Sequence, residues 1–476
     1  MLSKLDTEQY KKYAIIGIVG VFIVSIGLRF WGLGRFNVLV FDEVYYAKFA
    51  NNYLTNTKFF NSHPPLSQYL IAIGIWIGDR LPIGQDTTNM LTGSLHSTFS
   101  YRWMNALFGS LIPPVVAGLA YQLNQRLSFV FLATLFISLD GLFLVDSRYA
   151  LNNIYLVFFG LLGQLLLLMA SNKVGTSHIL LMLGAGISFG ASVACKWNGL
   201  WFLLGIYLLL AIAIIWKLIK FDRQDVAISN SLIDRLAKIK LIEIAFYLAI
   251  VPLATYSLLW IPHLIQNPEP NFIGVQWAIL NYHEQIKNGT GVHPYCANWY
   301  TWPLLMRPLA YYFKQYKPNF YYDVHAMGNP LLWWFALLAI FGSLWVIVKS
   351  PWLIVNRLKI ERAVLAPIRE INLNYLSVPL FVLINYVANL LPWVRVTRCL
   401  YIYHYMGAIV FAVMGLAWFV DVWLRSNSQI WRGVGITTIF SIVASFIFWL
   451  PIYLGLPIET SALSWRLWDF WIFNWI

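Results

Sequence analysis

Two adjacent acids, Asp42 and Glu43, are the residues of this chain best suited to acid–base chemistry. They stand in the segment VLVFDEVYYAKFANNYL, among aromatic and aliphatic neighbours. A carboxylate at the edge of an apolar region loses hydration, so its pKa rises and it can accept a proton from a reacting hydroxyl group. The other interpretation is a solvated pair in a loop, where acidic pairs are common. The pattern predicts a general base and leaves a surface role open.

Five cations stand at the boundaries of long apolar runs, where a charge is costly unless it pairs or meets an anion. They are Arg102, Arg148, Lys196, Arg395 and Arg398. One such cation is usually an interface residue whose head group reaches water. Five from different runs, all on one side of the membrane by the topology given below, indicate an anion site. The anion we expect is a phosphate on a lipid that lies in the bilayer.

Histidines and aromatic residues form a third group. His63 stands in FNSHPPLSQYL, where two prolines fix an extended turn and hold the imidazole in place. The segment NYHEQIKNGTGVHPYCANWYTWPLLMRPL is rich in Trp, Tyr and His, which suit stacking on a sugar or peptide or, alternatively, an interfacial aromatic belt. His283, Glu284 and His293 lack the spacing of a metal motif. We expect no metal site and no required cofactor, although a divalent cation stays open.

The composition places these residues in a membrane protein. Of 476 residues, 59% are hydrophobic and 11% are charged, whereas soluble domains carry about 25% charged residues. The net charge of +13 comes from Lys and Arg clustered between apolar runs, which is typical of cytoplasmic loops and contact with anionic lipid and not of nucleic-acid binding. The three cysteines, Cys195, Cys296 and Cys399, are far apart. We expect them to be packing residues, with no disulfide framework.

Eleven apolar segments are long enough to cross a bilayer, whose core needs about 20 residues per helix. A shorter apolar stretch, 65–77, predicts a helix that lies in the membrane interface. The first long segment has no small-residue cleavage site, so we interpret it as a retained anchor and not a signal peptide. The eleven segments are 13–33, 101–121, 127–146, 150–170, 177–195, 198–216, 241–261, 329–348, 373–393, 400–424 and 433–454.

The distribution of basic residues predicts the orientation. With a cytoplasmic N-terminus, the two most basic segments between spans, 217–240 and 349–372, both lie inside, as the positive-inside rule requires. The outer side then receives the acidic pair, the five cations and two long loops, 34–100 and 262–328. We predict a single transmembrane domain, 1–476, in the plasma (inner) membrane, with its reactive groups on the outer, periplasmic side.

Six motifs, in order along the chain, resemble those of the dolichyl-phosphate-mannose–protein mannosyltransferase family. The resemblance implies an all-α GT-C glycosyltransferase fold of about 11 transmembrane helices. It also implies inverting transfer of mannose from a polyprenyl-phosphate carrier to a Ser or Thr hydroxyl of a protein. The motifs run from Arg29 to about Phe411 and read FDEVYYAKFANNYL…FNSHPPLSQYL, YRWMNALFGSLIPPVVAGLAY, VDSRYALNNIYLVFF, CKWNGLWFLLG, HPYCANWYTWPLLMRPLAYYF and RVTRCLYIYHYMGAIVF.

The resemblance also implies roles for single residues. Asp42 would be the general base on the acceptor hydroxyl, and Glu43 would shape the site. Arg102 would contact the donor phosphate. Further phosphate-binding candidates are Arg148, Lys196 and Arg398. Substrate binding or structural support is implied for Arg29, His63, His293, Trp302, Arg395 and His404.

Two features depart from the family pattern. Many members have an acid a few residues after the Ser-Arg motif, where this chain has Asn153, so a second carboxylate is missing there unless Asp146 compensates. Eukaryotic members carry β-trefoil repeats in the late outer loop. The loop 262–328 is too short for them, so the chain resembles the prokaryotic type.

Two other functions fit part of the pattern. One is a related transferase, similar to the aminoarabinose transferases of lipid A, that acts on a lipid or glycan. The other is a transporter or flippase for a lipid-linked sugar, which would need no general base and would place charges at the bilayer midplane. No internal repeat typical of transporters is evident. The late motifs favour a protein acceptor.

Overall fold

The computed structural model describes residues 7–221, 231–363, 373–470 and 472–475. In this part of the chain, ten helices are long and apolar enough to cross a membrane. Their candidate spans are 18 to 26 residues long, close to the length that a bilayer core requires. They are α1 (Thr7–Phe30), α4 (Thr98–Leu123), α7 (Asn153–Ala170), α8 (Gly175–Cys195), α9 (Leu200–Phe221), the joined α11 (Leu241–Ala245) and α12 (Val251–Gln266), α14 (Pro330–Ala363), α15 (Ser377–Leu390), α16 (Met406–Leu424) and α17 (Gln429–Leu454).

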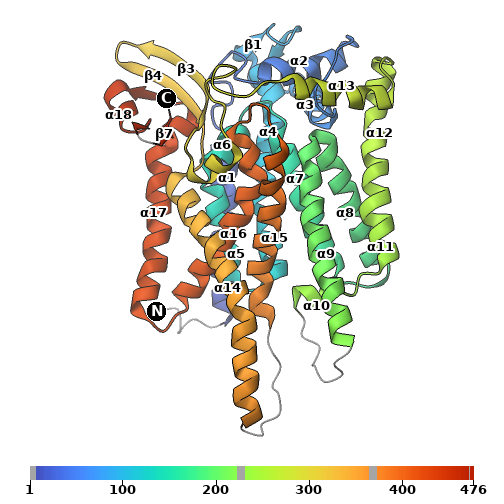
Figure 1. Cartoon of the computed structure of the whole chain (residues 1–476). Coiled ribbons are helices and arrows are strands. Elements are labelled where there is room, and N and C mark those ends of the chain that lie inside the picture. Colours follow the sequence, from blue (N-terminus) through green and yellow to red (C-terminus); the bar gives the residue numbers. More distant parts are fainter. Residues whose placement is uncertain (1–6, 222–230, 364–372, 471, 476) are drawn as a thin grey trace.

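The predicted span 127–146 is not one continuous helix. It is divided into α5 (Leu127–Ser138) and α6 (Gly141–Asp146). Asp140 stands at the break, and its carboxylate accepts hydrogen bonds from the backbone N–H of Phe143 at 3.0 Å and from Trp333 Nε1 at 2.5 Å. An Asp in this position caps a new helix and ends the old one. The prediction of eleven uninterrupted spans is therefore wrong at this segment, although α5 and α6 lie at successive levels of the same bundle (Figure 1).

The two long loops gather at one end of the bundle. This end carries α2 (Glu43–Leu54), α3 (Leu66–Gly78) and α13 (Phe272–Gln285), and α10 (Leu232–Leu236) lies at the opposite end with the start of α1 (Figure 1). Helix α3 is the short apolar helix predicted at 65–77. Parts of the two basic segments, 222–230 and 364–372, lie outside the described residues.

Within the described residues, three small antiparallel sheets interrupt the helical architecture, and the prediction of an all-α chain missed them. The largest has the strand order β3-β4-β5, with β3 (Leu309–Lys317) and β4 (Phe320–Ala326) paired so that Phe313 faces Asp323. Asn319 has a φ of +63° in the turn between them, a conformation that Asn tolerates better than most residues. The other strands are β1 (Thr88–Asn89), β2 (His96–Ser97), β5 (Pro457–Glu459), β6 (Asp469–Phe470) and β7 (Phe473–Asn474).

The core lies around α16. In the most apolar stretch of this helix 78% of the residues are buried, compared with 11% in that of α1. Glycines let neighbouring helices approach closely. A Cβ on Gly160 of α7 would lie 2.4 Å from the ring of Phe202 on α9, so only Gly fits at this crossing. The remaining short helices are η2 (Gln85–Thr87), η3 (Trp197–Gly199), η4 (Phe246–Ile250), η5 (Trp299–Leu304), η6 (Leu373–Leu376), η7 (Leu391–Arg395), η8 (Ile402–Tyr405) and α18 (Thr460–Ser464).

Candidate active site

Asp42 occupies a sharp turn that leads into α2. Phe41 before it has a φ of +50°, and its ring is held by stacking on Tyr311 at 4.5 Å. The Asp42 carboxylate is half-buried, and no hydrogen bond or ion pair to it is seen from the described residues. Burial raises the pKa of Asp42 to about 6, against the opposing charge of Lys196, and the charge of Asp146 raises it further. A carboxylate with this raised pKa and no partner among the described residues is able to accept a proton.

Glu43 has a different role, because the fold saturates its carboxylate. Arg102 on α4 binds it through both oxygens, with Nε to Oε1 at 2.8 Å and Nη2 to Oε2 at 2.7 Å. The backbone N–H groups of Val40 and Ala150 also donate to it, each at 2.8 Å. Both partners of the ion pair are almost fully buried. Glu43 fixes the turn that presents Asp42 and is not itself available to a substrate.

Arg102 was predicted to contact a phosphate, and the structure places it elsewhere. Besides Glu43, its guanidinium donates to the carbonyl oxygens of Leu33, Phe36 and Val38, at 2.7, 3.0 and 2.8 Å. Every nitrogen of the group is bound to protein acceptors. In this geometry no nitrogen is left for a donor phosphate, so the predicted contact stays a prediction that these hydrogen bonds do not support, and Arg102 organises the chain between α1 and α2.

Arg148 is likewise bound to the protein itself. It is buried beneath the C-terminal end of α1, where it donates to the carbonyl oxygens of Leu28 at 2.6 Å and Trp31 at 2.7 Å. A cation at a helix C-terminus binds carbonyl groups that have no partner within the helix. Arg29, which was predicted to support the loop, bonds to Ser25 within α1 and accepts from Arg148 through its carbonyl oxygen at 3.3 Å. Arg148 therefore stabilises a helix end, and its predicted phosphate contact stays a prediction that these hydrogen bonds do not support.

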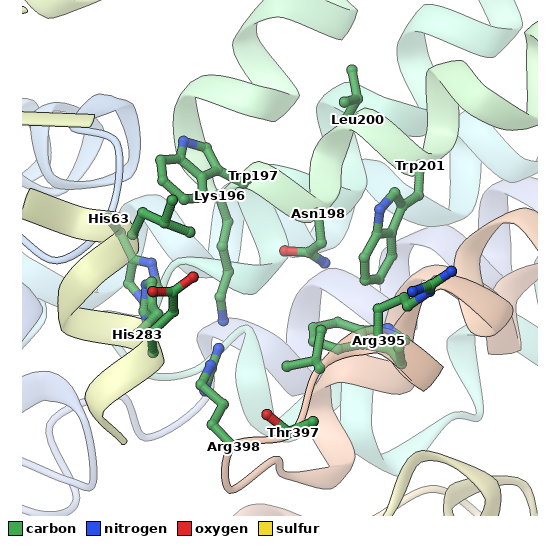
Figure 2. A pocket seen from close by; sticks show the side chains of 14 residues that line it. His63, Lys196, Trp197, Asn198, Leu200, Trp201, His283, Arg395, Thr397 and Arg398 are labelled. Carbon is green, nitrogen blue, oxygen red and sulfur yellow. The ribbon is translucent and has the colours of Figure 1, made fainter. Parts of the chain in front are cut away.

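A cavity of about 620 Å³ lies between the α8–α9 turn, α13 and the segment before α16. Lys196 and Arg398 line it and point toward the same space (Figure 2). Arg395 lines it as well, in another part of the same view. The acid among the lining residues, Glu284, is exposed and forms no ion pair within the described residues. Two convergent cations without a carboxylate between them are able to bind an anion.

Lys196 connects the cavity to the neighbourhood of Asp42. Its Nζ donates to Asn153 Oδ1 at 3.3 Å, and Asn153 Nδ2 in turn donates to Asp146 Oδ1 at 3.3 Å. Tyr311 OH completes the network by donating to the same Asp146 oxygen at 2.8 Å. Burial and the charge of Arg398 lower the pKa of Lys196 to about 7. The cavity therefore presents a cation that an incoming anion would stabilise.

The tight α8–α9 turn positions Lys196. The residue has an extended backbone directly after α8, and Gly199 lies so close to α8 that a Cβ there would be 2.5 Å from the backbone of Ser192. Only Gly allows this approach. The lysine side chain is thereby directed into the cavity beside the ring of Tyr403, 4.9 Å from its centroid.

Two histidines line the cavity near Lys196. The rings of His63 and His283 lie 5.1 Å apart, and His283 Nε2 is 2.9 Å from the carbonyl oxygen of Ser62. Burial lowers the pKa of His283 to about 4, and burial with the charge of Lys196 lowers the pKa of His63 well below its usual value. Both rings are neutral near pH 7, so they can offer hydrogen bonds without adding charge.

The other predicted support residues lie beside the cavity. His404 is buried against Trp393, a lining residue, at 4.5 Å between ring centroids and against Trp302 at 5.9 Å. His293 packs edge-on against Tyr401 at 5.1 Å. Trp302 and His404 therefore support a wall of the cavity from behind, and His293 lies nearer the turn that holds Asp42.

Cys296 and Cys399 form a disulfide, with their Cα atoms 5.2 Å apart. This contradicts the prediction that all three cysteines are packing residues, although the remaining one, Cys195, is free and buried. The N–H of Ala297 donates to Leu400 O at 2.8 Å beside the bridge. The aromatic outer loop is thus tied to the residue that follows Arg398. The cysteines are 103 residues apart, and no local spacing could have paired them.

Several residues of the site were missed in the sequence. His283 was considered only as a metal ligand, and among the described residues no cluster of three or more His, Cys, Asp or Glu could hold a metal ion. Tyr311 comes from the unpredicted strand β3. Its signal is the run of aromatic residues on both sides of Pro318-Asn319, a composition typical of two strands joined by a turn. The tryptophans of the aromatic outer loop were predicted to belong either to an interfacial belt or to a sugar site, and the sequence did not decide between the two.

Two family models match the chain. One, described as dolichyl-phosphate-mannose-protein mannosyltransferase, matches residues 19–266, which is more than half of the chain. The chain belongs to this family. A second model, described as the C-terminal four TMM region of protein-O-mannosyltransferase, matches residues 269–471. Together the two models account for nearly all of the described helices and for the resemblance seen in the motifs.

Curated relatives agree with the family assignment. The polyprenol-phosphate-mannose–protein mannosyltransferase of Mycolicibacterium smegmatis is 24% identical over 90% of this chain and 86% of its own length. The enzyme of the same name from Mycobacterium tuberculosis is 22% identical over 98% of this chain and 92% of its own length. This chain is accordingly an enzyme, a glycosyltransferase.

Solved structures of relatives share its fold. The Saccharomyces cerevisiae protein O-mannosyltransferase Pmt1–Pmt2 complex bound to the sugar donor gives a TM-score of 0.74 at 15% identity, covering 97% of this chain and 94% of that chain. The archaeal oligosaccharyltransferase AglB from Archaeoglobus fulgidus gives a TM-score of 0.55 at 12% identity, covering 94% and 56%. These likenesses show that the chain has the GT-C fold.

Proposed function

We propose that this family member transfers mannose from a polyprenyl-phosphate-mannose lipid to Ser or Thr hydroxyl groups of proteins, with Asp42 as the general base. The observation that carries the proposal is the pairing of an unpartnered carboxylate at Asp42 with the anion site at Lys196 and Arg398. Donor and acceptor are those in the names of the mycobacterial relatives.

The reaction needs a base at one side of the sugar and positive charge at the other. Asp42 takes the proton of the acceptor hydroxyl as its oxygen attacks the anomeric carbon. The bond from that carbon to the phosphate oxygen breaks, and the anomeric configuration is inverted because attack and departure occur on opposite faces. The departing lipid phosphate keeps the bonding electrons, and Lys196 and Arg398 stabilise its charge.

The supporting residues prepare this geometry before substrate arrives. The ion pair between Glu43 and Arg102 fixes the backbone on both sides of Asp42. Neutral His63 and His283 offer hydrogen bonds at the phosphate end of the cavity. A site assembled in advance does not reorganise during the reaction, which is the main source of electrostatic catalysis.

We also propose that the chain lies in the plasma (inner) membrane with a cytoplasmic N-terminus and an active site on the outer side. The described parts of the basic segments, 217–221, 231–240 and 349–363, lie at the end opposite the cavity and support this orientation through the positive-inside rule. The disulfide beside the cavity supports it independently, because disulfides persist in oxidising compartments outside the cytoplasm.

The test is sugar transfer in isolated membranes. Radiolabelled polyprenyl-phosphate mannose is offered with a Ser/Thr-rich peptide to the wild type and Asp42→Asn at matched expression. Asp86→Asn, an exposed acid of the same outer loop, is the matched control. We expect labelled peptide with the wild type and control, and a loss of at least about 100-fold with Asp42→Asn. Full transfer by Asp42→Asn would refute the base assignment. Label on a lipid or glycan would instead indicate a related transferase with another acceptor.

A further inference from the structure

Two adjoining cavities lie at the end of the bundle opposite the candidate active site. Their volumes are about 790 Å³ and 520 Å³, and both are lined by Asn172 and Arg235. Arg235 comes from the short helix α10, which Figure 1 shows at the lower end. Neither cavity shares a residue with the proposed transfer site, so a role for them is independent of the proposed function.

Arg235 is a buried cation that lacks an anion. Its side chain is 6% exposed, and its Nη2 donates to the carbonyl oxygen of Gln122 at 2.8 Å. Its Nε is buried with no hydrogen-bond partner, and no carboxylate of the described residues forms an ion pair with it. A buried guanidinium is strongly destabilising unless a negative charge compensates it. The missing partner is therefore an anion that enters the cavity.

Further positive charge surrounds the smaller cavity. Lys173, Lys238 and Lys240 line it with Arg235. The acid among its lining residues, Glu243, faces His178 at 3.3 Å. The local excess of positive charge fits a phosphate group, which accepts several charge-assisted hydrogen bonds at once.

The larger cavity has an apolar side. Trp345 and Val346 of α14 and Trp418 and Val422 of α16 line it, and Trp345 is 63% exposed. A free phosphate would leave this wall without a contact. A phospholipid would place its phosphate at Arg235 and an acyl chain along the two helices.

We propose that these two cavities form one binding site for the phosphate head group of an anionic phospholipid. The basic side receives the head group, and the groove between α14 and α16 receives an acyl chain. Basic pockets between transmembrane helices are suited to anionic head groups of the cytoplasmic leaflet, which is the leaflet that the proposed orientation assigns to this end.

The test uses the full chain purified in a neutral detergent. Thermal unfolding is measured with phosphatidylglycerol, with phosphatidylcholine of the same acyl chains, and with inorganic phosphate. The variants are Arg235→Gln and the double variant Lys173→Gln/Lys238→Gln, whose lysines are exposed. Arg432→Gln, an exposed cation that lines neither cavity, is the matched control.

We expect phosphatidylglycerol to raise the unfolding temperature of the wild type and control by about 2 °C or more, and the double variant to lose at least half of this shift. An equal shift in all variants, or with phosphatidylcholine, would overturn the site. The same protection by inorganic phosphate would overturn the lipid as its source. If Arg235→Gln does not fold, native mass spectrometry compares the phosphatidylglycerol retained by the double variant with that retained by the control. Equal retention in the two proteins would overturn the site.

Discussion

Replacing Arg102 with Gln separates a structural cation from a substrate-binding one. Arg102 donates to both oxygens of Glu43 and to three backbone carbonyl groups. Without it, the Glu43 carboxylate stays buried and keeps only the N–H donors of Val40 and Ala150. The turn that presents Asp42 then loses its main constraint. We expect the variant to fail in folding before it fails in substrate binding.

The size of the effect follows from the burial of the pair, whose two side chains are 1% and 0% exposed. Removing one partner of a buried ion pair costs about 3–5 kcal/mol, because an uncompensated charge is left behind. Typical proteins unfold at a cost of about 5–15 kcal/mol. The unfolding temperature should fall by about 6–20 °C at about 2–4 °C per kcal/mol. Replacing both partners, Glu43→Gln/Arg102→Gln, should recover part of this loss, because no lone charge remains.

The assay compares Arg102→Gln with Lys196→Gln in the same detergent, by unfolding temperature and by the KM for polyprenyl-phosphate mannose. Lys196 is a cavity cation whose pKa burial and Arg398 lower to about 7, so its removal should not destabilise the apoprotein. Losing one charge-assisted contact should raise its donor KM about 10- to 100-fold. The structural role of Arg102 would be refuted if Arg102→Gln unfolded at the wild-type temperature and its donor KM rose as much as that of Lys196→Gln.

Three further outcomes follow from the site. The profile of kcat/KM against pH should be bell-shaped, because Asp42, with its pKa raised to about 6, is a base only above pH 6, and Lys196, with its pKa lowered to about 7, is a cation only below pH 7. Asp42→Asn should abolish most activity, and the activity that remains should not fall at acidic pH. A flat profile between pH 5 and 8 would contradict both assignments. Reducing the disulfide, or replacing it by Cys296→Ser/Cys399→Ser, should raise the donor KM and lower the unfolding temperature, because the segment carrying Arg398 is released. Unchanged kinetics after verified reduction would show that the disulfide does not position the site. His283→Gln should raise the donor KM a few-fold with kcat retained, and a fall in kcat alone would place the ring at the reacting carbon instead.

Hydropathy and charge were sufficient to predict most of the bundle. Within the described residues, apolar length identified all ten crossing helices, and the basic segments correctly sorted both long loops to one end. The failure at 127–146 has a local cause. Asp140 satisfies its carboxylate by capping α6 and by accepting from Trp333, which lies far along the chain. Hydropathy averages over such a residue, so a break inside an apolar run is not visible to it.

The partners of the buried cations could not be predicted from the sequence. Arg102, Arg148 and Lys196 all stand at the end of an apolar run, and no local pattern distinguishes them. Their partners do: a carboxylate 59 residues away for Arg102, a helix C-terminus about 120 residues away for Arg148, and an open cavity for Lys196. Because the three cations have similar positions in the sequence, we predicted the same ligand for all of them. The tertiary contacts show that Arg102 and Arg148 instead bind groups of the protein itself.

The position of Asn153 is the departure from the family pattern that the structure best explains. Asn153 bridges Lys196 and Asp146, with 3.3 Å to each, and the second oxygen of Asp146 is buried without a partner. A carboxylate at 153 would face that of Asp146 at contact distance, and two like charges there cannot both stay ionised. Besides Asp42, one further negative charge near Lys196 is therefore sufficient, and Asp146 supplies it across one amide. We expect Asn153→Asp alone to impair transfer and Asp146→Asn/Asn153→Asp to restore it, measured at matched folded protein. A single Asn153→Asp variant as active as the wild type would contradict this exchange of charge between the two positions.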